Sequence, residues 1–231
     1  MEIGKIPERV WIARQVESKK GNQHNTTLVT MFELLKAGGF LIWPILICSI
    51  IALDIVIERF IALRKKEVAP PELIEKIGKR LKKGSIDTKT IGDIEEDSAL
   101  GRVLAAGLRN PNQHRVVVKE AIEEAGRHVV HDLEKNLQTL GTIAAVTPLL
   151  GLLGTVIGMI KVFAAITTFG VGDPQALAEG ISEALVTTAA GLAVGIPSLM
   201  FHRFFRGKVN ELAVDMEQQA LKFMKILQRN Q

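Results

Sequence analysis

Residues 183–197 read EALVTTAAGLAVGIP, and no charged side chain occurs from Ala184 to Phe201. This run is nearly long enough for a helix to cross a hydrocarbon layer of roughly 30 Å, which takes about 20 residues. It nevertheless follows a glutamate and contains two adjacent threonines, Thr187 and Thr188. A segment suited to lipid therefore carries polar groups that need a reason.

The composition indicates a membrane protein. Hydrophobic residues make up 47% of the 231 residues, yet aromatic residues make up only 5% and tyrosine is absent, a balance that is unusual for a soluble core. The single cysteine, Cys48, lies in an apolar run, and we interpret it as a packing residue because it has no partner for an intrachain disulfide. A net charge of +4 is weak support for nucleic-acid binding and ordinary for a protein on an anionic membrane face.

Three stretches are long enough to span a bilayer as helices, at about residues 38–57, 140–169 and 176–201. The fold class predicted is an all-α membrane protein with three transmembrane helices. We expect Pro44, Pro148 and Pro197 to kink these helices without breaking them, since backbone groups in lipid must stay paired.

Basic residues near the spans predict the orientation. Four lie between positions 59 and 66 and three between 203 and 208, whereas the connector TFGVGDPQALAEG has none. The positive-inside rule then places the connector outside and most of the polar chain in the cytoplasm. Residues 1–30 would lie outside despite five basic residues, so we interpret them as an N-terminal extension with little structure, with Met31 as a natural-looking start.

The polar chain between the first two spans has a mostly helical pattern. Residues 71–84 predict a short amphipathic helix, and the following GSIDTKTIGDIEEDS predicts a turn-rich stretch. From about Gln113 a helical period enters the second span without a breaker, and an apolar stripe continues beyond the third span to the C-terminus. Two helices of roughly fifty residues, about 75–80 Å long, are therefore expected to extend into a cytoplasmic helical domain.

These patterns predict seven segments. They are an extension (1–30), the first transmembrane helix (31–60), a cytoplasmic helical region (61–138), the second transmembrane helix (139–169), a periplasmic turn (170–175), the third transmembrane helix (176–206) and a cytoplasmic C-terminal helix (207–231). Asp173 before Pro174 predicts the start of the last long helix, because aspartate is a good N-cap and proline suits the first helical position.

Small residues at four-residue spacing predict close helix packing, since lipid gives helices no hydrophobic drive to associate. The candidates are Gly151, Gly154 and Gly158 on the second span and Gly191 and Gly195 on the third. Packing within one chain is the simpler interpretation, and packing between subunits of a ring is the alternative.

Charged and hydroxyl side chains in the spans predict a polar pathway, because burying a charge in lipid costs at least ~2.5–3.5 kcal/mol. Counting from Gly172 places Thr155 and Thr188 at nearly equal depth, and Lys161 level with Glu183, roughly 8–10 Å nearer the outside. We hypothesise that Lys161 and Glu183 form an ion pair at the outer mouth of this pathway. In the alternative, Lys161 snorkels to the headgroups. Thr155, Thr187 and Thr188 could also merely bond a carbonyl one turn back, and Asp54 and Glu58 fit a solvated interface beside Arg59.

The stretches TPLLGLLGTVIGMI and GISEALVTTAAGLAVGIP, with a first span ending in IERF, resemble the MotA/TolQ/ExbB proton-channel family, most of all its ExbB branch. The resemblance covers about residues 31–231. It implies a proton-driven motor subunit in the bacterial inner membrane, with a periplasmic N-terminus and a cytoplasmic C-terminus. The subunits would form a homo-oligomeric ring, typically a pentamer, around the single-span helices of an ExbD-like dimer, and the work would go to a TonB-type protein.

The resemblance also implies roles for individual residues. Thr155 and Thr188 match the threonines that line the inner face near the partner's aspartate, and Glu183 matches the glutamate of GIxEAL. We include Thr187 among the pore-lining candidates. Protons are the coupling ion, and no cofactor or metal is implied.

Other interpretations remain open: a TolQ-like or gliding-type motor subunit, or an oligomeric scaffold with a sealed core. An enzyme is disfavoured because no nucleophile and base are paired by spacing. His128 and His131 are the closest approach to a metal-ligand set, and their polar neighbours favour a solvated helix face.

Overall fold

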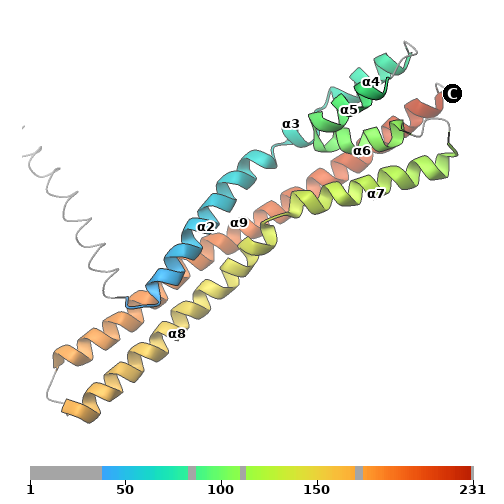
Figure 1. Ribbon diagram of the computed structural model, residues 1–231. Helices are drawn as coiled ribbons and strands as arrows, with labels where there is room; N and C mark the ends of the chain where they lie inside the picture. The colour runs from blue at the N-terminus through green and yellow to red at the C-terminus, as the bar shows by residue number, and fades with distance from the viewer. Residues whose placement is uncertain (1–37, 83–86, 110–112, 170–173, 230–231) are drawn as a thin grey trace, which may run out of the picture. The chain divides into compact units, whose positions relative to one another are not determined.

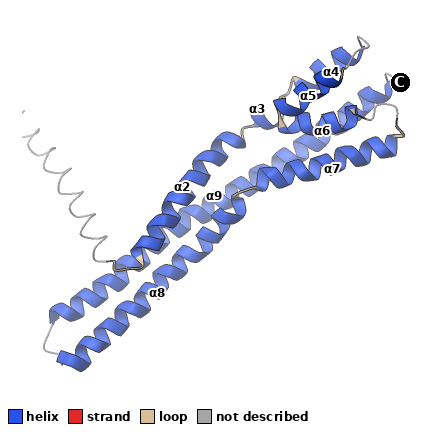
Figure 2. Cartoon of the chain, viewed as in Figure 1, coloured by secondary structure: helices blue, strands red, loops and turns tan. Residues whose placement is uncertain are grey.

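The structure is a computed structural model that describes residues 38–82, 87–109, 113–169 and 174–229, and every regular element among them is a helix (Figures 1 and 2). The helices are α2 (Ile42–Ala62), α3 (Lys65–Val68), α4 (Leu73–Lys82), α5 (Thr88–Asp97), α6 (Ala99–Leu108), α7 (Arg115–Glu134), α8 (Leu137–Phe169) and α9 (Pro174–Arg229). The predicted extension (1–30) and the predicted N-cap Asp173 lie outside the described residues.

The chain divides into two compact units. One consists of residues 1–47 and 147–194, and the other of residues 48–146 and 195–231. Helices α2, α8 and α9 each contribute a segment to both units. The first unit contains the three threonines and all the candidate packing glycines except Gly195, and the second contains Gly195 and the predicted cytoplasmic helices.

Two helical stretches, Arg115–Thr168 and Leu177–Leu227, are long and apolar enough to cross a membrane by length and composition. Only 22% and 28% of their most apolar windows are buried, so most of this apolar surface lies open on the single chain. Surface of this kind is typical of a segment that faces lipid or another protein. Helix α2 does not meet the same test, because Asp54, Glu58 and Arg59 occupy its second half.

Prolines occupy two different positions in these helices. Pro148 and Pro197 lie inside α8 and α9, which continue through them as predicted. Pro44 is in the first turn of α2, where a backbone N–H has no intrahelical partner in any case. The predicted kink at Pro44 therefore has no local cause.

Helix α9 is continuous over 56 residues, close to the predicted length. Its apolar stripe is buried, as the periodicity predicts. The buried members are Val209, Leu212, Met216, Ala220, Phe223 and Leu227. They belong to the second unit, where Leu100 and Leu104 of α6 are fully buried and where Gly107 of α6 lies against Ile122 of α7 and Phe223 of α9.

The turn-rich stretch predicted after residue 84 is wrong, because Thr88–Asp97 forms α5. Asp87 caps this helix by accepting a hydrogen bond from the Thr88 backbone N–H at 2.7 Å. Ile94 is the buried residue of α5. A side-chain cap and one buried anchor thus outweigh the weak helix propensity of its threonines, glycine and aspartates.

The unbroken helix predicted from Gln113 into the second span is also wrong. It is divided into α7 and α8 at Lys135–Asn136, where Asn136 has a positive φ of 64°. Asparagine is one of the few residues that adopt this conformation readily, and it commonly ends a helix in this way. The sequence has neither glycine nor proline here, so the break was not predicted.

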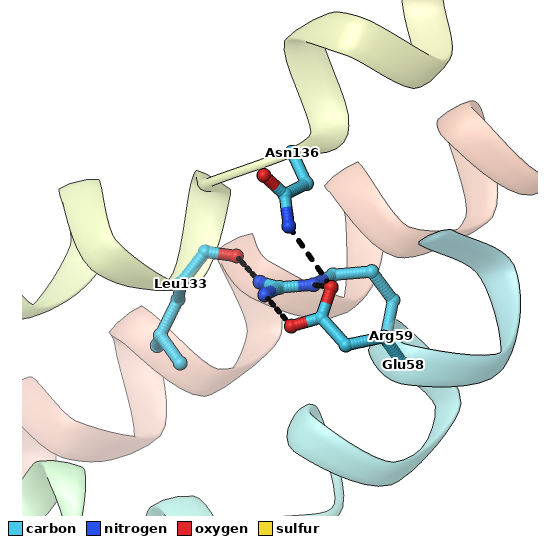
Figure 3. Close-up of polar contacts among 4 residues, drawn as sticks. All are labelled: Glu58, Arg59, Leu133 and Asn136. Carbon is cyan, nitrogen blue, oxygen red and sulfur yellow. Dashed lines mark hydrogen bonds and ion pairs between the residues drawn. The ribbon is translucent and has the colours of Figure 1, made fainter. Parts of the chain in front are cut away.

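Side chains of α2 hold this break in place (Figure 3). Arg59, only 5% exposed, donates from its NH1 group to the Leu133 carbonyl at 2.9 Å, which satisfies one of the carbonyls left without a partner at the end of α7. Arg59 also pairs with Glu58, and Glu58 accepts a hydrogen bond from the Asn136 amide at 3.0 Å. Arg59 therefore has a structural role beyond the solvated interface expected from the sequence.

Replacing Asn136 tests what sets the break between α7 and α8. Asn136→Ala should lower the thermal midpoint in detergent by more than Asn136→Gly, because a left-handed backbone costs alanine roughly 1–2 kcal/mol and glycine almost nothing. Both variants lose the hydrogen bond to Glu58, so the difference between their thermal midpoints measures the cost of the left-handed backbone at position 136. That cost corresponds to a few degrees in a chain of this size. Equal midpoints for the two variants would contradict this account.

The ion pair between Arg102 of α6 and Asp132 of α7, with 2.6 Å between NH1 and Oδ2, predicts a pH dependence. The hydrogen bond from Arg102 lowers the pKa of Asp132 below its ordinary value of 3.8, so its stabilisation is complete above that pH and is lost as the pH falls through the folded pKa. Arg102→Gln should therefore lower the thermal midpoint at pH 7, and this deficit should shrink as the pH falls below 3.8. Because both side chains are about half exposed, we expect no more than about 1 kcal/mol. A deficit that persists at the acid end would assign the effect to packing instead.

Candidate functional site

Glycines bring α8 and α9 together within one chain. A Cβ on Gly158 would lie 2.6 Å from the Gly180 carbonyl oxygen, and one on Gly191 would lie 2.6 Å from the Thr147 carbonyl oxygen. Both distances are far inside van der Waals contact, so no larger residue fits without moving a helix backbone. Gly154 is equally tight, at 2.5 Å from the Thr187 Cβ, and Gly151 is less so, at 3.1 Å from the Thr187 oxygen and the Thr188 Cα. These four glycines therefore pack helices within one chain, the simpler of the two interpretations above, and Gly195 is also buried.

Thr155 and Thr188 lie close together in depth. Gly151, one turn before Thr155 on α8, and Gly154, the residue directly before it, contact Thr188 and Thr187 of α9. Thr155 follows Gly154 directly, so it lies within about one helical turn of the Thr188 level. Both side chains are half-buried, which leaves each hydroxyl partly accessible on the single chain.

The hydroxyls of these two threonines donate to backbone carbonyls. Thr155 Oγ1 lies 2.6 Å from the Leu152 oxygen. Thr188 Oγ1 lies 3.0 Å from the oxygens of both Gly151 and Ala184, of which its single proton can serve one at a time. Each hydroxyl oxygen keeps acceptor capacity while it donates, so each site can receive a proton donor such as water or a protonated carboxyl group.

Thr187 is placed differently from the other two threonines. It is fully buried, and its hydroxyl donates to the Glu183 carbonyl and lies 3.5 Å from the Gly38 carbonyl oxygen. Gly154 faces its Cβ from α8. In this arrangement Thr187 fills the helix contact and presents no polar group to an open surface.

Lys161 and Glu183 are brought together. The Lys161 Nζ donates to both carboxylate oxygens of Glu183, at 2.8 Å to Oε1 and 2.6 Å to Oε2. The Glu183 side chain is 11% exposed and that of Lys161 is 55% exposed. The carboxylate is thus the desolvated member of the pair, and the lysine approaches it from the open side.

Gly38 and Gly39 also belong to this site, although the sequence did not predict it. These residues precede α2, and the structure places them against Thr187 and Glu183. A pair of glycines directly before an apolar helix was the available signal, because glycine allows close approach and unusual backbone angles.

His128 and His131 are both exposed on α7. In the ranges that the structure describes, no three His, Cys, Asp or Glu side chains converge as a metal site would require.

Comparison with known proteins agrees with this geometry. The family model that matches residues 95–218 is that of the MotA/TolQ/ExbB proton channel family, and this match contains the glycine contacts, the threonines and the ion pair. The chain belongs to this family.

Individual relatives include both branches that the sequence suggests. An ExbB homologue of Methanothermobacter thermautotrophicus is 31% identical over 79% of this chain and 65% of its own length. Biopolymer transport protein exbB1 of Vibrio cholerae is 32% identical over 72% of this chain and 75% of its own length. The Tol-Pal system protein TolQ of Haemophilus influenzae is 33% identical over 52% of this chain and 54% of its own length. The chain thus spans just under two thirds of the Methanothermobacter protein.

Removing one member of the ion pair should cost more than removing both. Lys161→Met leaves a nearly buried carboxylate without its counter-ion, for which the roughly 3–5 kcal/mol measured for fully buried pairs is an upper bound. We expect the double change Lys161→Met with Glu183→Gln to recover part of the lost thermal midpoint and oligomer yield in mild detergent. Lys161→Arg, which keeps the charge, is the control. A double variant less stable than Lys161→Met alone would contradict a coupled pair.

Proposed function

We propose that this chain is the proton-conducting subunit of an inner-membrane motor that acts with an ExbD-like partner and delivers its work through a TonB-type protein. The observation that carries the proposal is the pair of half-buried hydroxyls, Thr155 and Thr188, at the glycine-packed contact of two otherwise apolar helices. The family is one of proton channels. The relatives named for biopolymer transport and for the Tol-Pal system support the coupling to transport.

The proposed topology has three transmembrane helices. Helix α2 supports its inclusion, because exposed apolar side chains recur along one face at helical spacing. They are Trp43, Ile47, Ile50, Leu53, Ile57 and Ile61. This face suits lipid, whereas Ile45, Ala52 and Arg59 on the other side are buried. Together with the basic residues after the first and third spans, it favours a cytoplasmic region at 61–138 and a periplasmic turn between α8 and α9.

The threonines would act on a carboxyl group that the partner brings. A protonated carboxyl group can donate to Thr155 while the threonine keeps its bond to Leu152. A carboxylate can be stabilised only if the hydroxyl rotates away from that carbonyl. The site thus accepts both protonation states without changing its own charge, and the neutral state costs less rearrangement. Proton transfer through such a site would alternately neutralise and recharge the partner, and let it step around a ring of subunits.

We propose a homo-oligomer, a pentamer by resemblance, with the partner helices at its centre. Apolar side chains of α8 support an assembly in the membrane, since Leu149, Leu152, Ile160 and Phe163 are each exposed by about 60%. Some of these would face neighbouring copies and others lipid.

Two other functions have specific support. The similarity to a TolQ protein favours a Tol-type motor, which would differ in its partners and share the pathway. The carbonyl bonds of Thr155 and Thr188 favour a non-conducting scaffold, in which these hydroxyls only satisfy themselves.

Substitution by valine separates conduction from packing. Thr155→Val and Thr188→Val keep the side-chain shape and remove the hydroxyl, so each should lower proton flux into proteoliposomes at least about tenfold, while the oligomer stays intact. The measurement uses the chain purified with an ExbD-like single-span partner.

Thr167→Val is the matched control for this test. Thr167 lies on the same helix, is exposed and bonds the Ala164 carbonyl at 2.9 Å, much as Thr155 bonds Leu152. Its substitution should leave flux unchanged. Wild-type flux in both the Thr155 and Thr188 variants would reduce these threonines to packing residues. Absence of flux from the unsubstituted complex would favour the scaffold.

A further inference from the structure

The turn before α2 lies directly against the carboxylate of the ion pair. Gly38 is buried, and its carbonyl oxygen is 3.5 Å from the Thr187 hydroxyl. Gly39 follows with a positive φ of 62°, and the next turn starts α2 at Ile42. These residues, Lys161 and Glu183 belong to the same compact unit.

The Glu183 carboxylate occupies the space that a side chain at position 39 would need. A Cβ on Gly39 would lie 1.9 Å from Glu183 Oε1, 2.6 Å from Cδ and 3.1 Å from Cγ. Three atoms of one side chain are thus too close, and the nearest is one of the oxygens that Lys161 binds. Any substituent at position 39 would have to displace this carboxylate.

The carboxylate has little freedom to move aside. Its side chain is 11% exposed, and both oxygens are bonded to Lys161. Moving it would lengthen the ion pair in a place where water cannot easily replace the lost contact.

A short contact of an added Cβ is not peculiar to Gly39, because Gly38 would make one too. A Cβ on Gly38 would lie 2.9 Å from Cδ1 of Ile42 and 3.3 Å from both its Cβ and its Cγ1, so it would press on one apolar side chain. It would not touch Lys161 or Glu183 among its three nearest neighbours. The two adjacent glycines therefore differ in which side chain a Cβ would meet, and of the two only Gly39 also has a positive φ.

We propose that Gly39 is a positioning residue for Glu183. By having no side chain, it lets the turn before α2 close over the carboxylate and hold it against Lys161. The ion pair thus joins α8, which carries Lys161, to α9, which carries Glu183, and the turn at the start of the first apolar helix packs against it. The contact between Gly39 and Glu183 does not depend on the proposed function. The effect expected on proton flux does rest on that function.

A thermodynamic cycle tests this role on the full-length chain, assembled with its partner. Gly39→Ala should lower the thermal midpoint by several degrees through both the collision with Glu183 and the strain of a positive φ. Glu183→Ala removes the collision and keeps the strain. In the Glu183→Ala background the same Gly39→Ala step should therefore cost about half as much or less. An equal cost in the two backgrounds would overturn the proposal, because the glycine would then serve only the backbone.

Proton flux gives a second measurement that a purely structural role would not move. Glu183→Asp withdraws the carboxylate from position 39 by one methylene, so adding it to Gly39→Ala should restore flux at least about threefold over Gly39→Ala alone. Gly38→Ala should lower the proton flux less than Gly39→Ala does. The loss of thermal midpoint that it causes should also depend less on whether Glu183 is present. A Gly38 variant that matches the Gly39 variant in both measurements would overturn the proposal.

The outcomes separate this inference from the proposed function. If Gly39→Ala prevents assembly, Glu183→Ala should restore it, and a failure to do so would count against the collision. If the coupling appears in the thermal midpoints but the wild-type complex conducts no protons, the proposed function fails and the role of Gly39 stands.

Discussion

The close approach of α8 and α9 is the constraint on which the rest of the first unit depends. In an apolar medium two helices gain little from hydrophobic burial, so their contact relies on fit between surfaces. Gly158 and Gly191 provide this fit by letting each helix touch a backbone carbonyl of the other. The short separation then determines what the polar side chains can reach. Thr188 can bond the Gly151 carbonyl across the contact, and Lys161 can bond Glu183.

The same contact explains how polar groups persist in helices that are otherwise suited to lipid. Each one described has a partner within the chain: the threonine hydroxyls have carbonyls, and the carboxylate has an ammonium group. Their desolvation is therefore offset before any second protein arrives. Two kinds of group can still interact with a second protein: the threonine oxygens, which can accept a further hydrogen bond, and the Lys161 side chain, which is 55% exposed. A partner that brings an ionisable group meets a site that is already satisfied and only needs to exchange one hydrogen bond.

The predictability of these features follows from how local their causes are. The stripe on α9 was predictable because buried residues recur at helical period along one continuous helix, and the level of Lys161 with Glu183 followed from residue counting across a short turn. The break at Asn136 was not predictable from periodicity, since it depends on a positive φ supported by Arg59 and Glu58 of a distant helix. The burial of Thr187 was not predictable either, because the sequence does not show which of two adjacent threonines points toward the neighbouring helix. Gly39 acquires its significance from a contact with a residue far away in the sequence.

The break between α7 and α8 gives the two long helices of the chain different mechanical properties. Helix α9 continues without such a joint, and Pro197 inside it removes one backbone hydrogen bond. The other stretch is articulated at Lys135–Asn136, and the stiffness of that joint depends on two side chains of α2. A displacement imposed on α8 beside this joint would therefore be partly absorbed as bending there. Helix α2, through Arg59 and Glu58, sets how much of that bending occurs.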